Sequence, residues 1–143
     1  MLKPGAVIRG LMGEILSRIE GKGYSVVAMK LVQMARSQAE DLYEMHQGKP
    51  FFDELISHVL SAPVLVMVVE GPSVVRFMRK LSGSTDPLEA EVGTVRGDFG
   101  LTVTKNVIHA ADNAQNAKRE IAIFFKPEEM TSYQKPTEQK FAL

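Results

Sequence analysis

One histidine stands where a nucleophile would be useful. His109 follows an apolar stretch over residues 101–108 and precedes a helix start predicted near Asp112, so it lies at a junction where side chains can face a cleft. A neutral imidazole, with an ordinary pKa of about 6.5, can attack a phosphoryl group at neutral pH without further activation. The alternative is a histidine that only hydrogen-bonds to nearby backbone, and spacing alone favours that alternative.

A carboxylate in the following helix could assist this histidine. Glu120 lies in the helix predicted after His109, where it could turn back to hold one ring nitrogen and leave the other free to attack. From the pattern alone, a solvated glutamate on the helix surface is the simpler interpretation.

Two arginines and a threonine bracket a long segment without helical or strand periodicity. Loops as long as residues 83–98 are usually functional or disordered. Arg79, Thr85 and Arg96 could clamp a polyphosphate with two guanidinium groups and a hydroxyl, although arginines near a loop are common in any protein. The sequence has no GxxxxGK[ST] motif, so a Walker-type loop does not hold the phosphate.

Composition limits the class of protein. The 143 residues suffice for one domain with its own core, and 17 Lys and Arg balance 17 Asp and Glu, which predicts no nucleic-acid or membrane partner. The absence of cysteine excludes disulfides, thiolate catalysis and cysteine-ligated metals. The longest apolar stretch, residues 63–69, is far shorter than the roughly 18 to 20 residues that span a bilayer. We expect a soluble, cytoplasmic protein.

Helical and strand periodicities interleave along the chain without repeats or linkers. Ser37 and Glu40 form the pattern of a capping box, which predicts a helix carrying Leu42, Tyr43 and His46. Further helices are expected over residues 12–22, from 51, from 72 to 83 and from 112 to 124, and strands over 24–34, 64–70 in the sheet's centre, and 101–108. This pattern supports an α/β or α+β layered domain without choosing between them.

Five segments together resemble the nucleoside diphosphate kinase family over nearly the full length. The most specific is Asn106-Val107-Ile108-His109-Ala110-Ala111-Asp112, similar to the family's N-x-I-H-G/A-S-D signature around its phosphorylated histidine. The others agree in order and spacing: Lys3-Pro4 with Arg9-Gly10 and Gly13-Glu14, Lys49-Pro50-Phe51-Phe52, Pro63-Val64 through Glu70-Gly71, and Gly93-Thr94-Val95-Arg96-Gly97-Asp98-Phe99.

The resemblance implies a fold and an activity. The fold would be a ferredoxin-like α+β domain over residues 1–143, with an antiparallel four-stranded sheet covered by helices, a short N-terminal strand, and assembly into a homohexamer or homotetramer. In the implied ping-pong cycle, His109 takes the γ-phosphate of a nucleoside triphosphate, typically ATP, and passes it to a nucleoside diphosphate. Mg²⁺ would be held mainly through the nucleotide phosphates and not by protein ligands.

The resemblance also assigns roles to single residues. Glu120 would orient His109, and Tyr43 would lie beside the transferred phosphoryl group. The nucleotide-binding residues would be Lys3 and Asn106 at the ribose, Arg79, Thr85 and Arg96 at the phosphates with His46 nearby, and Phe51 stacked on the base against Val103 with Leu55 close by. Because stacking and apolar contact read no base edge, broad base tolerance is expected.

One position departs from the family's signature. Ala111 stands where the family usually has a serine that bridges the histidine and the glutamate, so Glu120 is expected to hold His109 directly or through water. A second interpretation is a catalytically weak nucleotide-binding module of the same fold that regulates a partner. A third, an oligomeric scaffold, has no positive sequence feature. Retention of His109, Arg79 and Arg96 favours the enzyme.

Overall fold

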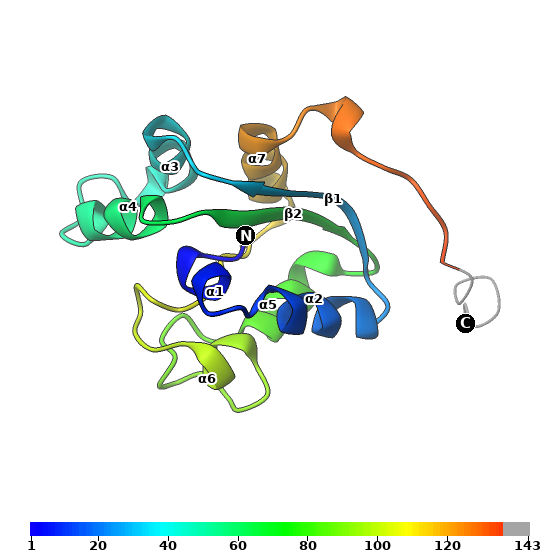
Figure 1. Cartoon of the computed structure of the whole chain (residues 1–143), viewed down its shortest axis with the longest axis horizontal. Helices are drawn as coiled ribbons and strands as arrows, with labels where there is room; N and C mark the ends of the chain where they lie inside the picture. The colour runs from blue at the N-terminus through cyan, green and yellow to red at the C-terminus, as the bar shows by residue number, and fades with distance from the viewer. Residues whose placement is uncertain (136–143) are drawn as a thin grey trace.

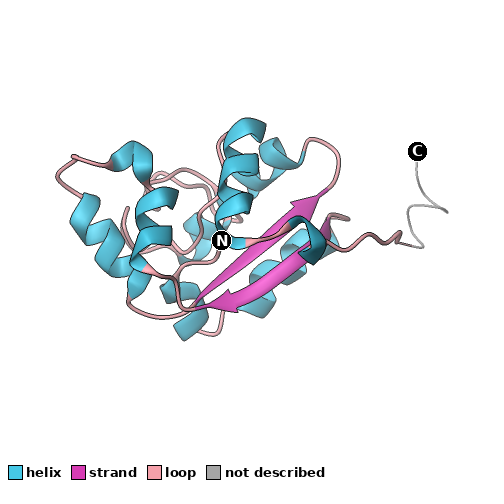
Figure 2. Cartoon of the chain, turned by 90° about the horizontal axis from the view of Figure 1, so that it is seen from above, coloured by secondary structure: helices cyan, strands magenta, loops and turns pink. Residues whose placement is uncertain are grey.

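The computed structural model describes residues 1–135, and its sheet is a two-stranded antiparallel ribbon. Strand β1 (Ser25–Val32) pairs with strand β2 (Val64–Glu70), and a bulge interrupts the register between Val26 and Ala28. Both strands are rich in valine, whose branched side chain suits a pleated surface. Figure 2 shows the two strands side by side, with helices around them. The strands predicted over 24–34 and 64–70 are confirmed.

Helices cover both faces of this ribbon. In Figure 1, α3 (Arg36–Leu42) and α7 (Ala114–Phe124) lie above the strands, and α4 (Phe52–Leu60) lies at the left-hand end of the strands. The others lie below: α1 (Pro4–Ile8), α2 (Met12–Gly21), α5 (Val74–Ser82) and α6 (Val95–Phe99). Short 3-10 turns cover Glu44–His46 and Pro127–Glu129. Within the described residues, no helix is long and apolar enough to cross a membrane.

The core has two halves that meet at β2. Successive side chains of a strand point to opposite faces, so β2 supplies apolar residues to both. Val64 and Val66 pack with the buried residues of α3 and α4, whereas Leu65 packs with Ile15 of α2. Burial on both faces explains why β2 reads as a continuous apolar run.

The first residues of the chain lie between β2 and the segment that carries His109. Leu2 forms antiparallel bridges to both Leu65 and Ile108. The Leu2 amide donates to the Leu65 carbonyl at 2.8 Å, and the His109 amide donates to the Met1 carbonyl at 2.8 Å. Four backbone segments therefore lie in one row, with β1 and β2 followed by residues 1–3 and then by residues 107–109.

The four-stranded sheet is not confirmed, because two of these four segments form single bridges in place of strands. Pro4 begins α1, so the extended segment near Leu2 stops at Lys3. Val107 has a φ of 75°, which interrupts extended backbone, and residues 102–105 form bends. The strand predicted over 101–108 is therefore wrong, while the coarser α+β class holds.

Most predicted helices are present, but some of them begin at other residues than predicted. Helix α7 begins as expected, with the Asn113 side chain accepting a hydrogen bond from the Asn116 amide at 2.8 Å. The cap predicted at Ser37 is wrong, because Ala35 is the N-cap of α3 and its amide donates to the Gln38 side chain at 3.0 Å. His46 lies in the 3-10 turn after α3 and not in the helix, and α5 begins after Pro72.

The long segment after α5 is ordered by polar contacts. Gly83 ends α5 with a φ of 83°, a conformation that favours glycine. Thr94 caps α6: its hydroxyl accepts from the Gly97 amide at 3.0 Å and donates to the Glu91 carbonyl at 2.6 Å. Asp98 accepts from the Gly93 amide at 2.8 Å. Helix α6 shortens the predicted loop and directs Arg96 toward the interior, where that side chain is buried.

We predict that Gly97→Ala destabilises the fold. A Cβ atom at Gly97 would collide with the Glu91 carbonyl and approach the Thr94 hydroxyl at 2.9 Å, and these are backbone and capping groups that cannot move aside. Overpacking of this kind costs about 1–3 kcal/mol in the free energy of unfolding, measurable by urea denaturation. Gly13→Ala on α2 is the control, since a Cβ there meets nothing within 4 Å. Equal stability of the two variants would contradict the packing argument.

Candidate active site

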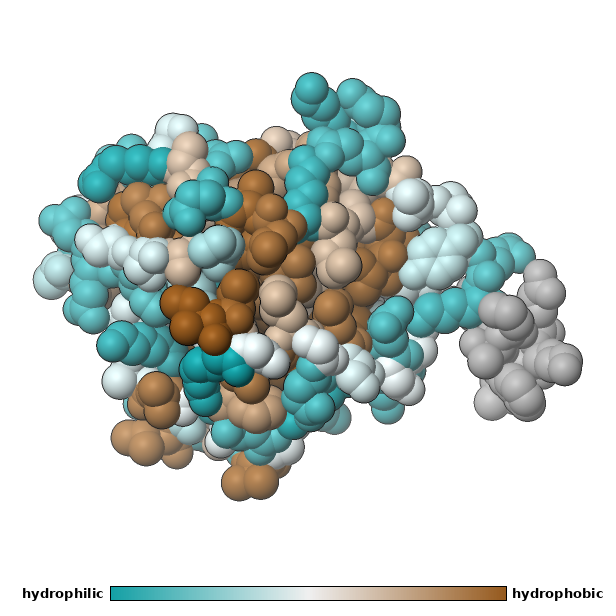
Figure 3. Space-filling view, viewed as in Figure 1, coloured by the Kyte–Doolittle hydropathy of each residue, from teal (hydrophilic) through white to brown (hydrophobic). Residues whose placement is uncertain are grey.

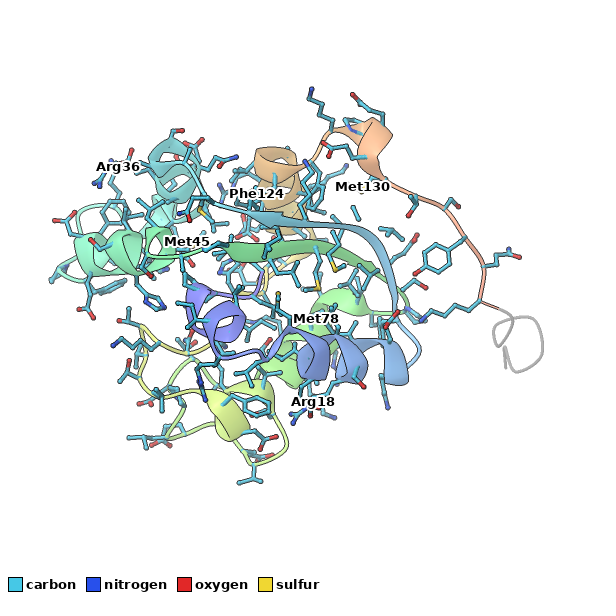
Figure 4. All side chains as sticks on the ribbon, viewed as in Figure 1. Arg18, Arg36, Met45, Met78, Phe124 and Met130 are labelled. Atoms are coloured by element: carbon cyan, nitrogen blue, oxygen red, sulfur yellow. The ribbon has the colours of Figure 1, made fainter. Side chains whose placement is uncertain are left out.

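One cavity of about 450 Å³ brings together all the residues singled out from the sequence. Its lining includes Lys3, Tyr43, His46, Phe51, Leu55, Arg79, Thr85, Arg96, Val103, Asn106, His109 and Glu120. The lining also includes Met45, Thr104, Ala110 and Asp112, which sequence reasoning missed as site residues. Ala110 and Asp112 lie within the His109 signature. Met45, labelled in Figure 4, gave no signal in the sequence, because a methionine can line a cavity or pack in a hydrophobic core.

His109 and Glu120 are in direct contact. The Nε2 atom of His109 lies 3.0 Å from Oε1 of Glu120. An ionised carboxylate only accepts hydrogen bonds, so Nε2 carries the proton and Nδ1 keeps its lone pair. Of the two alternatives left by Ala111, direct contact is observed, and a bridging hydroxyl is not required for it.

The surroundings keep the imidazole neutral at pH 7. Burial lowers the pKa of His109 below 6.5, and the hydrogen bond that the ring donates to Glu120, which raises the pKa, offsets burial only in part. The side chain is still 22% exposed, so a substrate can reach it. An uncharged, oriented and accessible ring is the form of histidine that can act as a nucleophile.

Backbone carbonyls hold the two arginines of the cavity. Arg96 is buried, and its guanidinium donates to the Gly83 carbonyl at 2.9 Å and to the Ile108 carbonyl at 2.8 Å. Arg79 makes a longer contact of 3.4 Å to the Ala110 carbonyl. Arg96 therefore ties the end of α5 to the residue before His109.

Lys3 reaches the cavity from the other end of the chain. Its Nζ atom donates to Oδ1 of Asn106 at 2.7 Å, and the Asn106 amide nitrogen donates to the Thr85 carbonyl at 2.9 Å. Lys3 and Asn106 are both buried. The asparagine is thereby oriented from both ends of its amide, and the loop after α5 is fastened to the site.

Positive charge accumulates in the cavity without a carboxylate partner. Among residues 1–135, no ion pair joins Lys3, Arg79 or Arg96 to an acidic side chain. Burial, and then the charge of Arg96, lower the pKa of Lys3 to about 8. Burial, and then the charge of Arg79, lower the pKa of Arg96 to about 10. Mutually repelling cations in one cavity are suited to a polyanion that supplies the countercharge.

Tyr43 packs edge-on against His109, with ring centroids 5.6 Å apart and an interplanar angle of 86°. Its hydroxyl is buried and has no hydrogen-bond partner in the part of the chain that the structure describes. Burial, and then the charge of Glu120, raise the pKa of this hydroxyl, so it remains a donor at neutral pH. This donor beside His109 has no acceptor, and a bound anion can provide one.

Apolar surface lines another part of the same cavity. Phe51 is 44% exposed and Val103 is 54% exposed. The Phe51 ring also packs edge-on against His46, at a centroid distance of 5.3 Å. Burial, and then the charge of Lys49, lower the pKa of His46, so this histidine is neutral at pH 7. An exposed ring and an exposed aliphatic side chain offer a flat ligand two faces.

A family model described as nucleoside diphosphate kinase matches residues 1–130. Among curated relatives, the nucleoside diphosphate kinase of Thermosipho melanesiensis is 55% identical over 132 residues, covering 92% of this chain and 90% of the relative. The enzyme of the same name from Ignicoccus hospitalis is 55% identical over 130 residues, covering 91% of this chain and 88% of the relative.

Solved structures agree with this match. A halophilic nucleoside diphosphate kinase from Halobacterium salinarum, solved in complex with CDP, is similar with a TM-score of 0.93 and 39% identity, covering 97% of this chain and 93% of that chain. A nucleoside diphosphate kinase family protein from Babesia bovis is similar with a TM-score of 0.92 and 38% identity, covering 97% of this chain and 94% of that chain.

We predict that His109 titrates below 6.5 and that Glu120→Gln lowers its pKa further, because the carboxylate is the partner that favours the charged ring. The measurement is an NMR titration of the three histidines, assigned with single His→Asn variants. Glu20→Gln, a change at an exposed residue of α2, should leave the titration of His109 unchanged. A pKa of His109 that rises in Glu120→Gln would refute the arrangement.

Proposed function

The chain belongs to the nucleoside diphosphate kinase family, whose members are phosphotransferases acting on nucleotides, and we propose that it works through a phosphohistidine at His109. The observation that carries this proposal is the 3.0 Å contact between Glu120 and Nε2 of His109, which leaves Nδ1 as the free nucleophile. The domain would extend over residues 1–143, and its place would be the cytoplasm, as its lack of cysteine allows.

The proposed reaction has two half-reactions at one site. The Nδ1 lone pair of His109 forms a bond to the γ-phosphorus of a nucleoside triphosphate such as ATP, and the bond from that phosphorus to the bridging oxygen breaks. The nucleoside diphosphate then leaves with the electron pair. A terminal β-phosphate oxygen of a second diphosphate attacks the phosphohistidine, the P–N bond breaks, and the free imidazole returns. Glu120 stabilises the positive charge that the ring gains when it is phosphorylated.

The unpaired donors of the cavity suit the charge that moves in this reaction. Arg79 and Arg96, with Thr85, would contact the phosphate oxygens as guanidinium and hydroxyl donors. The unpartnered hydroxyl of Tyr43 lies beside His109, where it would donate to the transferred phosphoryl group. His46, which is neutral, would lie close to the phosphates without adding charge.

Base and sugar would occupy the rest of the cavity. Phe51 would stack on the base against Val103, with Leu55 nearby, while Lys3 and Asn106 would bind the ribose hydroxyls. The complex of the Halobacterium salinarum enzyme with CDP supports a nucleoside diphosphate as the ligand of this cavity. Since stacking makes no hydrogen bond to a base edge, purine and pyrimidine nucleotides should both be accepted.

Mg²⁺ fits this cavity as an ion carried by the nucleotide. No group of three or more His, Cys, Asp or Glu able to hold a metal occurs among the described residues. Of the two acids that line the cavity, Glu120 is occupied by His109, and Asp112 accepts a hydrogen bond from Asn116 at 2.6 Å. Mg²⁺ commonly binds through substrate phosphates and water, where it neutralises part of the phosphate charge.

We also propose a homo-oligomer, a hexamer or a tetramer. Large apolar side chains are exposed, including Met29 and Leu31 of β1 and Ile8 of α1. Figure 3 shows hydrophobic residues gathered over the middle of one face of the molecule. Contiguous apolar surface of this kind typically meets a partner. The row of four backbone segments supports the strand arrangement of a four-stranded sheet.

The direct His109–Glu120 contact favours an active kinase over a catalytically weak regulatory module. A module that had lost catalysis would not need an oriented neutral imidazole beside unpaired cations. No feature of the described residues specifically supports the module.

We predict that His109→Ala abolishes phosphoenzyme formation and phosphate exchange, because the nitrogen that forms the covalent bond is gone. The test is incubation with γ-labelled ATP, followed by assay for acid-labile, base-stable label and for turnover with a second diphosphate. His58→Ala is the matched control, since His58 lies on α4 and is not among the residues that line the cavity. Normal turnover by a folded His109→Ala protein would exclude the ping-pong cycle.

We predict that nucleoside diphosphate binding takes up protons at pH 8. Lys3 has a pKa of about 8 in the free protein, so it is about half charged at that pH, and a bound anion favours the charged form. Uptake should approach about half a proton at pH 8 and fall to about a tenth at pH 7. Affinity should be fully present below pH 8 and decline as the pH rises above it.

Calorimetry in buffers of different ionisation enthalpy measures this uptake. Lys3→Met should abolish it, whereas Lys22→Met, a change at an exposed residue after α2, should not. Equal uptake by the two variants would show that another group binds the proton.

A further inference from the structure

Two separate stretches of the chain must meet to place Tyr43 beside His109. His109 and Glu120 belong to one stretch, because His109 lies in the segment that leads into α7 and Glu120 lies within that helix. Tyr43 belongs to the other stretch, since it is the C-cap of α3. Helices α3 and α7 are in contact, and Figure 1 shows both of them above the strands. The way in which these two helices meet therefore sets the position of the Tyr43 ring.

Arg119, the residue before Glu120, connects the two helices. Its guanidinium donates to the Asp41 carbonyl at 2.8 Å and to the Leu42 carbonyl at 3.5 Å. Carbonyls in the last turn of a helix lack donors within the helix and carry the negative end of its dipole, so a cation is favourable there. The Glu44 carboxylate lies 4.0 Å from Arg119 and is 71% exposed, so this ion pair adds little. The two carbonyls are the main partners of the guanidinium.

These contacts act on the backbone of Tyr43 itself. The carbonyl of Leu42 and the amide N–H of Tyr43 belong to one planar peptide group. Arg119 donates to the carbonyl of this group, and the N–H of the group donates to the Ala39 carbonyl at 3.1 Å. The peptide group that leads into Tyr43 is therefore held on both sides, once by its own helix and once by α7.

The ring of Tyr43 depends on this backbone placement. Among residues 1–135, its buried hydroxyl has no hydrogen-bond partner that could fix it. The ring contacts His109 edge-on at a centroid distance of 5.6 Å, and its centroid lies 6.2 Å from that of the His46 ring. Because packing alone orients the side chain, the position of its backbone decides how closely the hydroxyl approaches His109.

We propose that Arg119 is a positioning residue, which fastens the end of α3 to α7 and thereby keeps the Tyr43 hydroxyl beside His109. Arg119 is not among the described residues that line the cavity, so it acts through Tyr43 and not on the substrate. The effect on phosphoryl transfer rests on the proposed function, whereas the placement of the ring does not depend on it.

The placement of Tyr43 is measured without substrate. In the parent protein, the edge-on pair should give a nuclear Overhauser effect between ring protons of Tyr43 and His109. In Arg119→Met this effect should weaken, while the titration of His109 stays unchanged, because Glu120 still contacts its ring. A variant in which neither quantity changes would overturn the proposal. A variant in which both change would also overturn it, since α7 itself would then have loosened.

Single-turnover phosphorylation of His109 by γ-labelled ATP measures the effect on the reaction. Arg119→Met should slow this step about three- to tenfold, as expected when hydrogen bonds that place a reacting group are lost. In a Tyr43→Phe background, which lacks the hydroxyl, the same change should slow the step by less than about twofold, because the positioned group is gone. An equal loss in both backgrounds would show that Arg119 acts by another route and would overturn the proposal.

Two further variants complete the set. Arg119→Lys keeps a cation that can reach one carbonyl, so it should recover part of both the Overhauser effect and the rate. If Arg119→Met does not fold, Arg119→Lys is compared with the parent in the same two measurements, with smaller losses expected. Lys118→Met removes a cation from the neighbouring, exposed position of α7 and should behave like the parent. Equal losses in Lys118→Met and Arg119→Met would refute the role of the carbonyl contacts. If the parent protein is never phosphorylated, the kinase proposal fails, and the Overhauser effect still decides the placement of Tyr43.

Discussion

The double pairing of Leu2, with Leu65 on one side and Ile108 on the other, is the constraint on which the site depends. Neither neighbour of this residue is free to move independently of it. On the C-terminal side, Lys3 is placed to bond Asn106. On the N-terminal side, the Met1 backbone pairs with that of His109. A short extended segment thus fixes the positions of both His109, the proposed nucleophile, and Lys3, a cation of the same cavity.

The electrostatics of the cavity oppose the stability of the free protein. Lys3 and Arg96 are buried and Arg79 lies at the exposed part of the same cavity. Burial and mutual repulsion lower the pKa values of Lys3 and Arg96, so their charge is unfavourable before a ligand arrives. A bound phosphate chain would relieve this repulsion. The proposed affinity of the site for polyanions follows because no acidic side chain among the described residues pairs with these cations.

Local sequence patterns predicted most of the elements, and the family resemblance selected the residues that line the cavity. The apolar run of β2 and the N-cap of α7 follow from local chemistry, and both are confirmed. The strand predicted over residues 101–108 is absent because Val107 has a positive φ. Surrounding tertiary structure maintains this conformation, which conflicts with the backbone preference of a β-branched residue.

Patterns of single residues could not show that His109 contacts Glu120. This contact depends on how helix α7 packs over β2, which local periodicity does not reveal. The family resemblance supplied that pairing, because ordered matches carry information on three-dimensional contacts that periodicity lacks. The prediction that Ser37 caps α3 failed for a different reason. Gln38 and Ser37 can each supply the capping side chain at this helix start, and propensity does not rank the two.

The pairing of Met1 with His109 also has a consequence for biosynthesis. These two residues lie 108 positions apart in the sequence, so their contact closes a large loop. A ribosome releases the first residues long before it adds the histidine and the helix that orients it. Half of the core around β2 can collapse earlier, but the pairing of His109 with Glu120 cannot exist in any nascent chain that ends before Glu120. A nascent chain can therefore form this arrangement only after α7 has left the ribosome.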